Sequence, residues 1–304
     1  MTTLLILGSS NIDHVMHVKQ LPTAGETCMT QDYQVHFGGK GANQAVACAR
    51  LCAPSTKVHF ISALGSDPIA KNMCAQWKKD GLNLEAITFI DNENTGSAMI
   101  FIDSQGENCI AANAGANDKL LPKMLVKQDN LFTQAQFLLL QLEIPLDTVK
   151  QALLLAKQKQ CQTILNPAPA KKLDASILSL VDIITPNETE AFELTGIRVT
   201  DAFSAQQAAN TLHHIDVKCV IITLGSQGAY VSEEGEGQLI STSPAKALDT
   251  VAAGDTFNGA LMVGLAENMP LHQAVRFANQ AAGITVTRHG AQAAIPHRSE
   301  LTMT

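Results

Sequence analysis

Residues 249–265 read DTVAAGDTFNGALMVGL, a loop of small residues followed by an apolar segment. The Ala-Ala-Gly run at 252–254 has almost no side chains, so a ligand can approach its backbone closely. Apolar residues then recur at helical spacing from Phe257 to Leu265. The free N–H groups at a helix start, together with the positive end of its dipole, form a favourable site for an anion. The stretch therefore predicts an anion site at the start of a buried helix.

Asp255 lies at the edge of this predicted anion site, where a negative charge is unfavourable if the site only binds an anion. An acid in this position indicates chemistry on the anion. The alternative is structural, because an Asp at the start of a helix is often an N-cap and small residues before a helix often form only a tight turn. Taken alone, the stretch slightly favours the structural interpretation, and the rest of the chain decides between the two.

A second glycine-rich loop, GGKGAN at residues 38–43, also precedes a helix-like segment. Its three glycines let a ligand approach the backbone, and apolar positions from Ala42 to Ala49 share one helical face. The loop is not a Walker A motif, because that motif requires Ser or Thr after the lysine and Gly41 follows Lys40. Two loop–helix junctions of this kind favour a ligand site more strongly than one does.

The composition limits the classes of protein that the chain can represent. With 304 residues, of which 46% are hydrophobic and 16% charged, the chain is long enough for one large domain with a sizeable core. Its formal net charge of −7 argues against a nucleic-acid partner bound through counterion release. Anionic small molecules can still bind locally at backbone amides and a few basic side chains.

Cysteine usage and the apolar runs predict a cytoplasmic protein. The 7 cysteines are odd in number and contain no C-x-x-C pair, so buried free thiols in a reducing compartment are expected. The apolar run at residues 4–7 is too short for a signal peptide. No stretch approaches the ~18 apolar residues of a membrane span, so no membrane partner is expected.

Strand-like and helix-like segments alternate from Phe137 onward, which predicts a parallel sheet with right-handed crossovers. An apolar run at residues 3–7 predicts a further buried strand, and residues 57–62 another. The carboxyl ends of parallel strands meet at one edge of the sheet, where ligands bind. The polar or glycine-rich groups that follow the predicted strands are Asn11, Asp13, Glu143, Asn187, Glu190 and the segments 223–228 and 249–255.

Two regions have no helix between their strand-like segments. Residues 15–37 lack helical periodicity, and residues 95–102 and 107–112 form a plausible hairpin. We expect these regions to pair into a small separate sheet. Asn11 and Asp13 alternate, so in an extended chain both side chains point the same way. An amide and a carboxylate on one face suit a polyhydroxylated ligand, although a polar loop explains them equally well.

These motifs resemble the ribokinase-like (PfkB) carbohydrate kinase family, and the resemblance runs from about Leu5 to Pro296. The motifs that carry it are Asn11-Ile12-Asp13, residues 38–43, TPNETE at 185–190, TLGSQG at 223–228 and residues 252–259. The resemblance implies an α/β fold with a doubly wound, mostly parallel central sheet flanked by helices. It also implies a small β-sheet lid over the sugar, formed by about residues 12–37 and 95–113, which often serves as a homodimer interface.

The same resemblance implies an ATP-dependent kinase that phosphorylates D-ribose at the 5-hydroxyl to give ribose 5-phosphate and ADP. Asp255 would be the catalytic base, and the backbone amides of Ala252, Ala253 and Gly254 would stabilise charge on the phosphate. The implied sugar-binding residues are Asn11, Asp13, Gly39, Lys40, Gly41, Asn43, Glu143 and Asp255. The implied ATP-binding residues are Asn187, Glu190, Thr223, Gly225, Ser226, Gly228, Gly254 and Asn279, with Glu190 also organising Mg²⁺ through water.

The family resemblance further implies a monovalent cation, usually K⁺, beside the nucleotide. Its implied site comprises Asp249, Val251, Thr285, Arg288, Gly290 and Ala294. Ala294 stands where the family pattern has a serine, which removes a possible hydroxyl ligand. Asn279 stands where a histidine beside the adenine is usual. Both departures affect tuning of the site more than its chemistry.

Two alternatives remain from the sequence. The first is a kinase of another sugar, such as deoxyribose or fructose, or of a nucleoside. The lysine of the GGKGAN motif favours ribose over a nucleoside, because the nucleoside branch of the family usually lacks it. The second is a sugar-binding protein without catalysis, against which the presence of Asp255, Asn187 and Glu190 argues.

Overall fold

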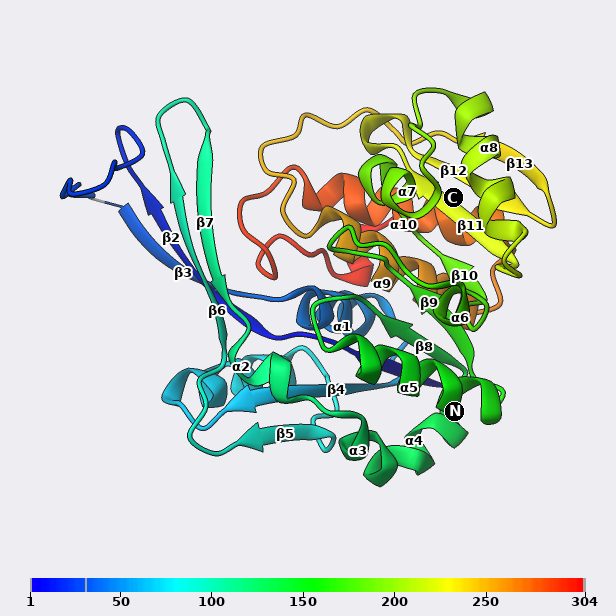
Figure 1. Ribbon diagram of the computed structural model, residues 1–304, viewed down its shortest axis with the longest axis horizontal. Coiled ribbons are helices and arrows are strands. Elements are labelled where there is room, and N and C mark those ends of the chain that lie inside the picture. The colour runs from blue at the N-terminus through cyan, green and yellow to red at the C-terminus, as the bar shows by residue number, and fades with distance from the viewer. Residues whose placement is uncertain (1, 31, 303–304) are drawn as a thin grey trace.

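The computed structural model describes residues 2–30 and 32–302, so position 31, within the predicted lid segment 12–37, lies outside the described residues. A nine-stranded sheet in the order β13-β12-β11-β10-β9-β8-β1-β4-β5 forms the centre of the molecule (Figure 1). Its strands are β1 (Thr3–Leu7), β4 (Lys57–Gly65), β5 (Ile87–Ile90), β8 (Phe137–Leu140), β9 (Gln162–Leu165), β10 (Ile183–Ile184), β11 (Cys219–Thr223), β12 (Ala229–Glu233) and β13 (Glu236–Ile240).

Helices cover both faces of this sheet (Figure 1). The longer helices are α1 (Lys40–Leu51), α2 (Pro68–Lys79), α5 (Leu146–Gln158), α7 (Glu188–Thr195), α8 (Ala202–His213), α9 (Ala253–Ala266) and α10 (Leu271–Thr285). The shorter ones are α3 (Pro122–Leu125), α4 (Asp129–Gln134) and α6 (Ala175–Leu178). Helices α5 and α8 lie in the region after Phe137, where strand-like and helix-like segments were predicted to alternate.

Strand β1 shows how the sheet separates two apolar layers. Its residues are fully buried, and successive side chains point to opposite faces. Leu4 and Ile6 pack in the layer that contains α1, α2, α9 and α10, whereas Leu5 and Leu7 pack in the layer that contains α5 and α8. A strand buried on both faces is read as a continuous apolar run, which explains why it was recognisable in the sequence.

The central sheet is parallel from β5 to β11 and ends in an antiparallel edge. Strand β12 runs antiparallel to β11, and β13 antiparallel to β12. The alternation of strands and helices thus predicts the parallel part of the sheet, while β12, β13 and α10 were not identified from the sequence. Strand β4 is longer than the strand predicted at residues 57–62, because it continues to Gly65, which pairs with Ile90 of β5.

A separate four-stranded sheet in the order β3-β2-β6-β7 projects from the body of the molecule (Figure 1). Its strands are β2 (Asn11–His17), β3 (Asp32–Gly38), β6 (Gly96–Ile102) and β7 (Asn108–Asn113). The predicted hairpin is present as the antiparallel pair β6–β7. Strand β2 continues the chain directly from the end of β1, so the small sheet is anchored at the carboxyl edge of the large one.

The cysteines are free thiols, as the sequence predicted, but they are not all buried. Cys48, Cys161 and Cys219 are buried, whereas Cys109 in β7 is exposed. Within residues 2–30 and 32–302, no helix is both long and apolar enough to cross a membrane.

Candidate active site

Helix α9 begins at Ala253, and Ala252 is its N-cap residue with a left-handed backbone (φ 60°). Asp255 therefore lies inside the first turn of the helix, and the N-cap interpretation of this residue was wrong. The first N–H groups of a helix have no acceptor within it. In the described part of the chain, no side chain caps α9. The Ala253 N–H already donates to the Thr250 carbonyl at 3.3 Å, so the amides of Gly254 and Asp255 are the ones left to bind an anion.

Asp255 is only 7% exposed, and both of its carboxylate oxygens are held by side chains of α1. Asn43 Nδ2 donates to Oδ2 at 2.9 Å, and Gln44 Nε2 donates to Oδ1 at 3.0 Å. Burial raises the pKa of Asp255. The Lys40 ammonium and the two amide hydrogen bonds act in the opposite direction, but the effect of burial is larger. A buried carboxylate whose pKa is raised in this way is typical of a group that accepts a proton.

Lys40 opens α1 and is the cation that faces the carboxylates of the site. Burial lowers the pKa of its ammonium, but Asp255, Glu143 and Glu190 raise it by more, so its pKa lies above the ordinary value. The ammonium is therefore charged, and the carboxylates that raise its pKa come from α9, from the segment after β8 and from α7. Such a fixed positive charge can attract a phosphate as well as neutralise the acids around it.

Asn11 and Asp13 lie on one face of β2, as their alternation predicted. Asn117 Nδ2 donates to Asn11 Oδ1 at 2.8 Å and so orients the amide. Burial, followed by the nearby Glu143 carboxylate, raises the pKa of Asp13 to about 6. Glu143 Oε2 accepts hydrogen bonds from Ser9 Oγ at 2.6 Å and from the backbone N–H of Lys40 at 3.0 Å. The site thus offers oriented acceptors of the kind that bind sugar hydroxyls.

The glycines of residues 38–43 allow close packing within the chain, in addition to the ligand access that the sequence predicted. A Cβ on Gly41 would lie 2.5 Å from the carbonyl carbon of Gly8, and one on Gly39 (φ +89°) 2.7 Å from the backbone nitrogen of Asn11. These residues let the start of α1 lie directly against the β1–β2 connection. By contrast, a Cβ on Gly254 would meet no other atom within 4 Å, so packing of the chain does not require glycine there.

Asn187 and Glu190 form a capping box at the start of α7. Asn187 Oδ1 accepts from the Glu190 N–H at 2.8 Å, and Glu190 Oε2 accepts from the Asn187 N–H at 2.9 Å. This arrangement has a structural role by itself. Glu190 is nevertheless 6% exposed, and burial raises the pKa of its carboxyl in spite of the Asn187 hydrogen bond and nearby Lys40. Asp255 adds to that rise, so the Glu190 carboxyl lies close enough to Asp255 for their charges to interact.

The remaining predicted nucleotide residues lie around the ends of β11 and β13. The N–H of Thr223 donates to the Pro186 carbonyl at 2.9 Å, which places it beside the start of α7. Gly225 and Ser226 are exposed. Gly228 (φ +104°) packs against the carbonyl of Ile240, and Asn279 Nδ2 donates to that same carbonyl at 3.1 Å. The structure thus brings Gly228 and Asn279 to one place.

The predicted cation residues lie on two segments that Asp249 connects. Its Oδ1 accepts from the Val251 N–H and its Oδ2 from the Gly290 N–H, both at 2.9 Å. Thr285 ends α10 and is buried, as is Ala294. The described residues contain no cluster of three His, Cys, Asp or Glu side chains suited to a metal. A cation here would therefore rely mainly on backbone carbonyls and Asp249.

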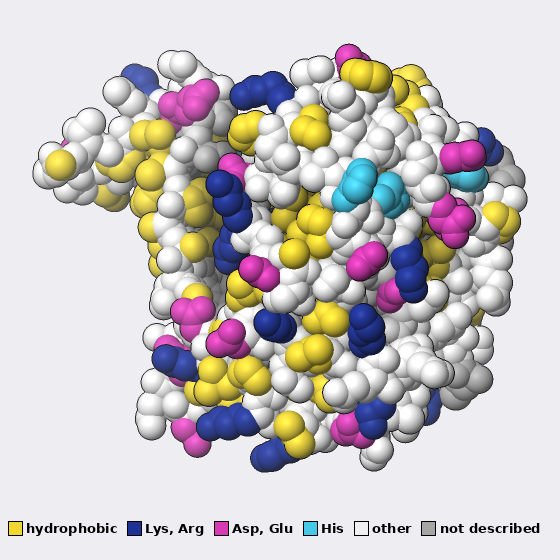
Figure 2. Space-filling view, turned by 45° about the vertical axis from the view of Figure 1, so that its right-hand side comes forward, with side chains coloured by type: hydrophobic (Ala, Val, Ile, Leu, Met, Phe, Trp, Pro, Cys, Tyr) yellow, Lys and Arg dark blue, Asp and Glu magenta, His cyan; other side chains and the backbone are white. Residues whose placement is uncertain are grey.

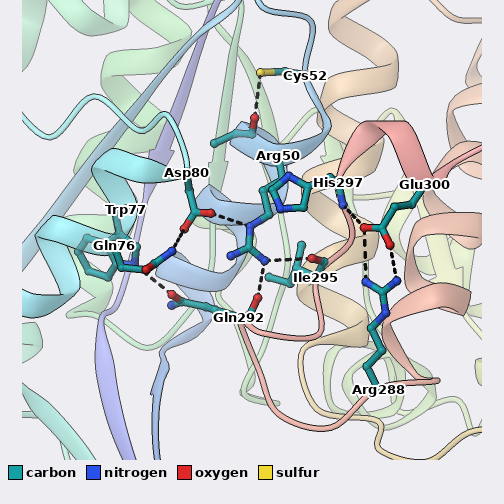
Figure 3. A network of polar contacts seen from close by, with 11 residues as sticks. Arg50, Cys52, Gln76, Trp77, Asp80, Arg288, Gln292, Ile295, His297 and Glu300 are labelled. Atoms are coloured by element: carbon teal, nitrogen blue, oxygen red, sulfur yellow. Dashed lines mark hydrogen bonds and ion pairs between the residues drawn. The ribbon is translucent and has the colours of Figure 1, made fainter.

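A polar network holds the segment from Arg288 to Ile295, which carries Gly290 and Ala294 (Figure 3). Arg50 donates to the carbonyls of Gln292 and Ile295, the latter at 2.9 Å, and pairs with Asp80 at 2.8 Å. Arg288, at the start of the segment, pairs with Glu300. The Arg288 guanidinium is thus engaged with the Glu300 carboxylate, and no contact of the described residues joins it to Asp249.

Sequence reasoning did not identify several polar residues that support the site. They are Ser9, Gln44, Asn117, Gln141 and Asn166. Gln44 directly follows the GGKGAN motif, and its position next to Asn43 was a usable signal. The others occur singly after buried strands or in irregular segments, where spacing alone does not distinguish them.

Fold and site together describe a small-molecule kinase, with a glycine-bearing helix start, a buried acid and polar groups along one sheet edge. The chain matches the pfkB family of carbohydrate kinases over residues 1–298. It therefore belongs to that family. It is 45% identical to the ribokinase of Haemophilus influenzae over 298 residues, covering 98% of this chain and 96% of that protein. It is 40% identical to the ribokinase of Staphylococcus aureus, covering 98% and 97%.

A solved structure of Arabidopsis thaliana ribokinase, complexed with ribose and ATP, is similar throughout. The TM-score is 0.93 at 34% sequence identity, and the match covers 98% of this chain and 97% of that one. The small sheet, the central sheet and the helix layers are all within the matched length.

Proposed function

We propose that this protein transfers the γ-phosphoryl group of ATP to the 5-hydroxyl of D-ribose. The observation that carries the proposal is the position of Asp255: a buried carboxylate in the first turn of α9, where the amides of Gly254 and Asp255 are left to bind an anion. Relatives that are 45% and 40% identical over nearly the whole chain are ribokinases, which supports ribose as the substrate. A similar structure binds ribose and ATP.

In the proposed reaction, Asp255 accepts the proton of the 5-hydroxyl as that oxygen attacks the γ-phosphorus. The bond between the γ-phosphorus and the bridging oxygen of ADP breaks, and the proton remains on the carboxyl group until it is released. The amides of Gly254 and Asp255, at the start of α9, stabilise the charge on the phosphate oxygens. Lys40 adds a positive charge near Asp255, Glu143 and Glu190. Phosphoryl transfer requires mainly such positioning and charge stabilisation.

The sugar hydroxyls are proposed to bind between β2 and α1. Asn11, Asp13 and Glu143 supply oriented oxygens, and the amides of the glycine-rich loop supply donors. Because one oxygen of Glu143 is already held by Ser9 and Lys40, the carboxylate presents a fixed direction to a ligand. The complete proposed set is Asn11, Asp13, Gly39, Lys40, Gly41, Asn43, Glu143 and Asp255.

ATP is proposed to lie along the ends of β11 and β13, with its phosphates toward α9. The proposed contacts are Asn187, Glu190, Thr223, Gly225, Ser226, Gly228, Gly254 and Asn279. Mg²⁺ usually binds through substrate phosphates, waters and one or two carboxylates. Buried Glu190 fits that role, and the ion would supply charge neutralisation on the phosphates. The Asp249 carboxylate is proposed as the charged ligand of a K⁺ ion, with the backbone carbonyls of Val251, Thr285, Arg288, Gly290 and Ala294 as further ligands.

The small sheet is proposed to act as a lid and as the interface of a homodimer. Figure 2 shows hydrophobic side chains along this part of the surface. Val35 and Met99 both pair with His14, so they share one face of the sheet, and they are 45% and 43% exposed. A half-exposed apolar sheet face fits a second copy of the same chain.

We also propose that the protein acts in the cytoplasm, where ATP is available and thiols stay reduced.

A coupled assay of ADP release tests the proposed function. Ribose should give turnover well above deoxyribose, fructose and adenosine, and K⁺ should raise the rate. A lid that excludes water predicts little ATP hydrolysis without sugar. Higher turnover with another sugar or with adenosine would assign a different substrate. Ribose binding without ADP release would instead indicate a sugar-binding protein without catalysis.

A further inference from the structure

We propose that Gln44 is a positioning residue for the reaction, because its side-chain amide fixes the orientation of the Asp255 carboxylate and favours its charged form. This inference rests on the proposed function, in which Asp255 is the base. Nothing in the comparisons assigns a role to Gln44, and its side chain would act on the substrate only through Asp255.

The contacts of Asp255 divide between two neighbouring amides of α1. Gln44 Nε2 donates to Oδ1 at 3.0 Å, and Asn43 Nδ2 donates to Oδ2 at 2.9 Å. With one donor on each oxygen, the plane of the carboxylate is fixed, and each oxygen keeps a lone pair that can accept a proton. Gln44 itself is fully buried, so water cannot replace its amide readily.

The direction of the Gln44 amide is set by its other neighbours. Gln141 Nε2 donates to Gln44 Oε1, and the second hydrogen of Gln44 Nε2 goes to Asn166 Oδ1 at 3.1 Å. Asn166 Nδ2 in turn donates to the carbonyl of Thr185 at 3.3 Å. Turning the Gln44 amide over would place its oxygen against two acceptors and its nitrogen against a donor. The chain of amides therefore commits Gln44 to donate to Asp255.

The charge of Asp255 makes this donation important. Burial raises the pKa of its carboxyl, and a protonated acid cannot accept the proton of a hydroxyl. Lys40 and the amides of Asn43 and Gln44 oppose that effect. Asn43 is also among the proposed sugar contacts, whereas Gln44 faces only the protein. Gln44 is thus the residue whose removal should change the base while leaving the sugar contacts in place.

The test compares Gln44→Met with the unchanged protein in ribose phosphorylation. Met has a similar volume but no donor. We expect kcat to fall by about 10²-fold, the cost of a slightly misplaced reacting group. The KM for ribose should change little. The acidic limb of the pH profile of kcat should move up by about one pH unit, because the charged form loses a hydrogen bond.

Thr148→Val is the matched control, since it removes a buried hydrogen bond of α5, from Thr148 Oγ1 to the Leu120 carbonyl at 2.6 Å, away from Asp255. It should lower Tm without moving the pH profile. An unchanged kcat and pH profile in Gln44→Met would overturn the inference. If that variant does not fold, Gln141→Met tests the same point by removing the donor that orients Gln44, and it should move the profile in the same direction. An unmoved profile there would also overturn it.

Asp255→Asn, measured in parallel, separates this inference from the proposed function. Near-normal turnover of that variant would show that Asp255 is not the base, and the proposed function of Asp255 would fail. Loss of turnover in Asp255→Asn with an unaltered Gln44→Met would leave the base in place and remove only the role of Gln44.

Discussion

Asn43 Nδ2 donates a hydrogen bond to Asp255 Oδ2 at 2.9 Å, although the two residues are 212 positions apart. The contact joins the two glycine-bearing loop–helix junctions of the chain, at the starts of α1 and α9. It places a buried acid in the first turn of α9, against the glycine-rich loop at the start of α1. A sugar hydroxyl and a phosphate can therefore meet at Asp255, which is the basis of the first prediction.

Replacing Asp255 with Asn should abolish most turnover while ribose still binds. Asn keeps the shape of the side chain but cannot accept the proton of the 5-hydroxyl. A general base typically contributes ~10²–10⁴-fold to the rate, and we expect a loss of kcat in that range. The measurements are ADP release and calorimetric titration with ribose. Near-normal turnover would contradict the role of Asp255, and loss of ribose binding would show that the change disturbs the sugar site.

Gly254→Ala should impair catalysis without lowering stability. A Cβ at this position meets no other atom within 4 Å, and the residue lies in the first turn of α9. Alanine is the better helix former, so the free energy of unfolding should stay the same or rise by up to about 1 kcal/mol. The Tm should therefore not fall. The added methyl would displace a phosphate from the helix amides. A misplacement of about 1 Å costs roughly 10²-fold in kcat/KM.

The control for this prediction is Gly41→Ala, whose Cβ would lie 2.5 Å from the backbone of Gly8. That change should lower Tm strongly, because backbone atoms must move to admit it. If Gly254→Ala keeps full kcat/KM for ATP, the helix start does not hold the phosphate. Steady-state kinetics and thermal unfolding of both variants provide the comparison.

Much of the central sheet was predictable because its strands are buried on both faces and appear as apolar runs. The shared direction of Asn11 and Asp13 was predictable from the period of two in a strand. The edge strands β12 and β13 were not identified from the apolar pattern, and β13 is mostly exposed. The interpretation of Asp255 as the N-cap of α9 was wrong. The helix begins after Ala252, whose backbone is left-handed, and no side chain caps it in the described part of the chain.

The support of the site was harder to predict than its motifs. Gln44, Gln141 and Asn166 make contacts across 97 to 211 positions in the sequence, and no local spacing indicates which amide will face which acid. Gly41 shows a related limit. Its sequence context predicted access for a ligand, while the structure shows close packing against Gly8. Such pairings depend on how strands and helices are placed, which one sequence does not specify locally.

Ribose binding should weaken as the pH falls below about 6. Burial and Glu143 raise the pKa of Asp13 from 3.8 to about 6, so its carboxyl takes up a proton in this range. The ionised carboxylate accepts hydroxyl hydrogen bonds strongly, and protonation removes that interaction. The Kd for ribose, measured by calorimetry without ATP, should rise by up to about tenfold for each pH unit below 6. Asp13→Asn should bind weakly with a much flatter pH dependence.

The sign for folding stability in the free protein is opposite. Because the folded-state pKa of Asp13 lies above its ordinary value, the folded state holds a proton more tightly than the unfolded state. The contribution of this group to stability is therefore greatest at low pH and decreases as the pH rises from about 4 to about 6. Asp13→Asn should remove this part of the pH dependence of Tm. A ribose Kd that does not vary between pH 5 and 8 would contradict the prediction.

Charges on the exposed face of the small sheet should separate a dimer into monomers. Val35 and Met99 flank His14 on that face, and each is nearly half exposed in the single chain. Burying an unpaired carboxylate in an interface is unfavourable, so Val35→Glu with Met99→Glu should reduce the mass measured by light scattering to one chain. Phe203→Glu is the control, since Phe203 is 73% exposed on α8, outside the small sheet. It should leave the mass unchanged. A monomeric unchanged protein, or a double variant that remains dimeric, would rule out this face as the dimer interface.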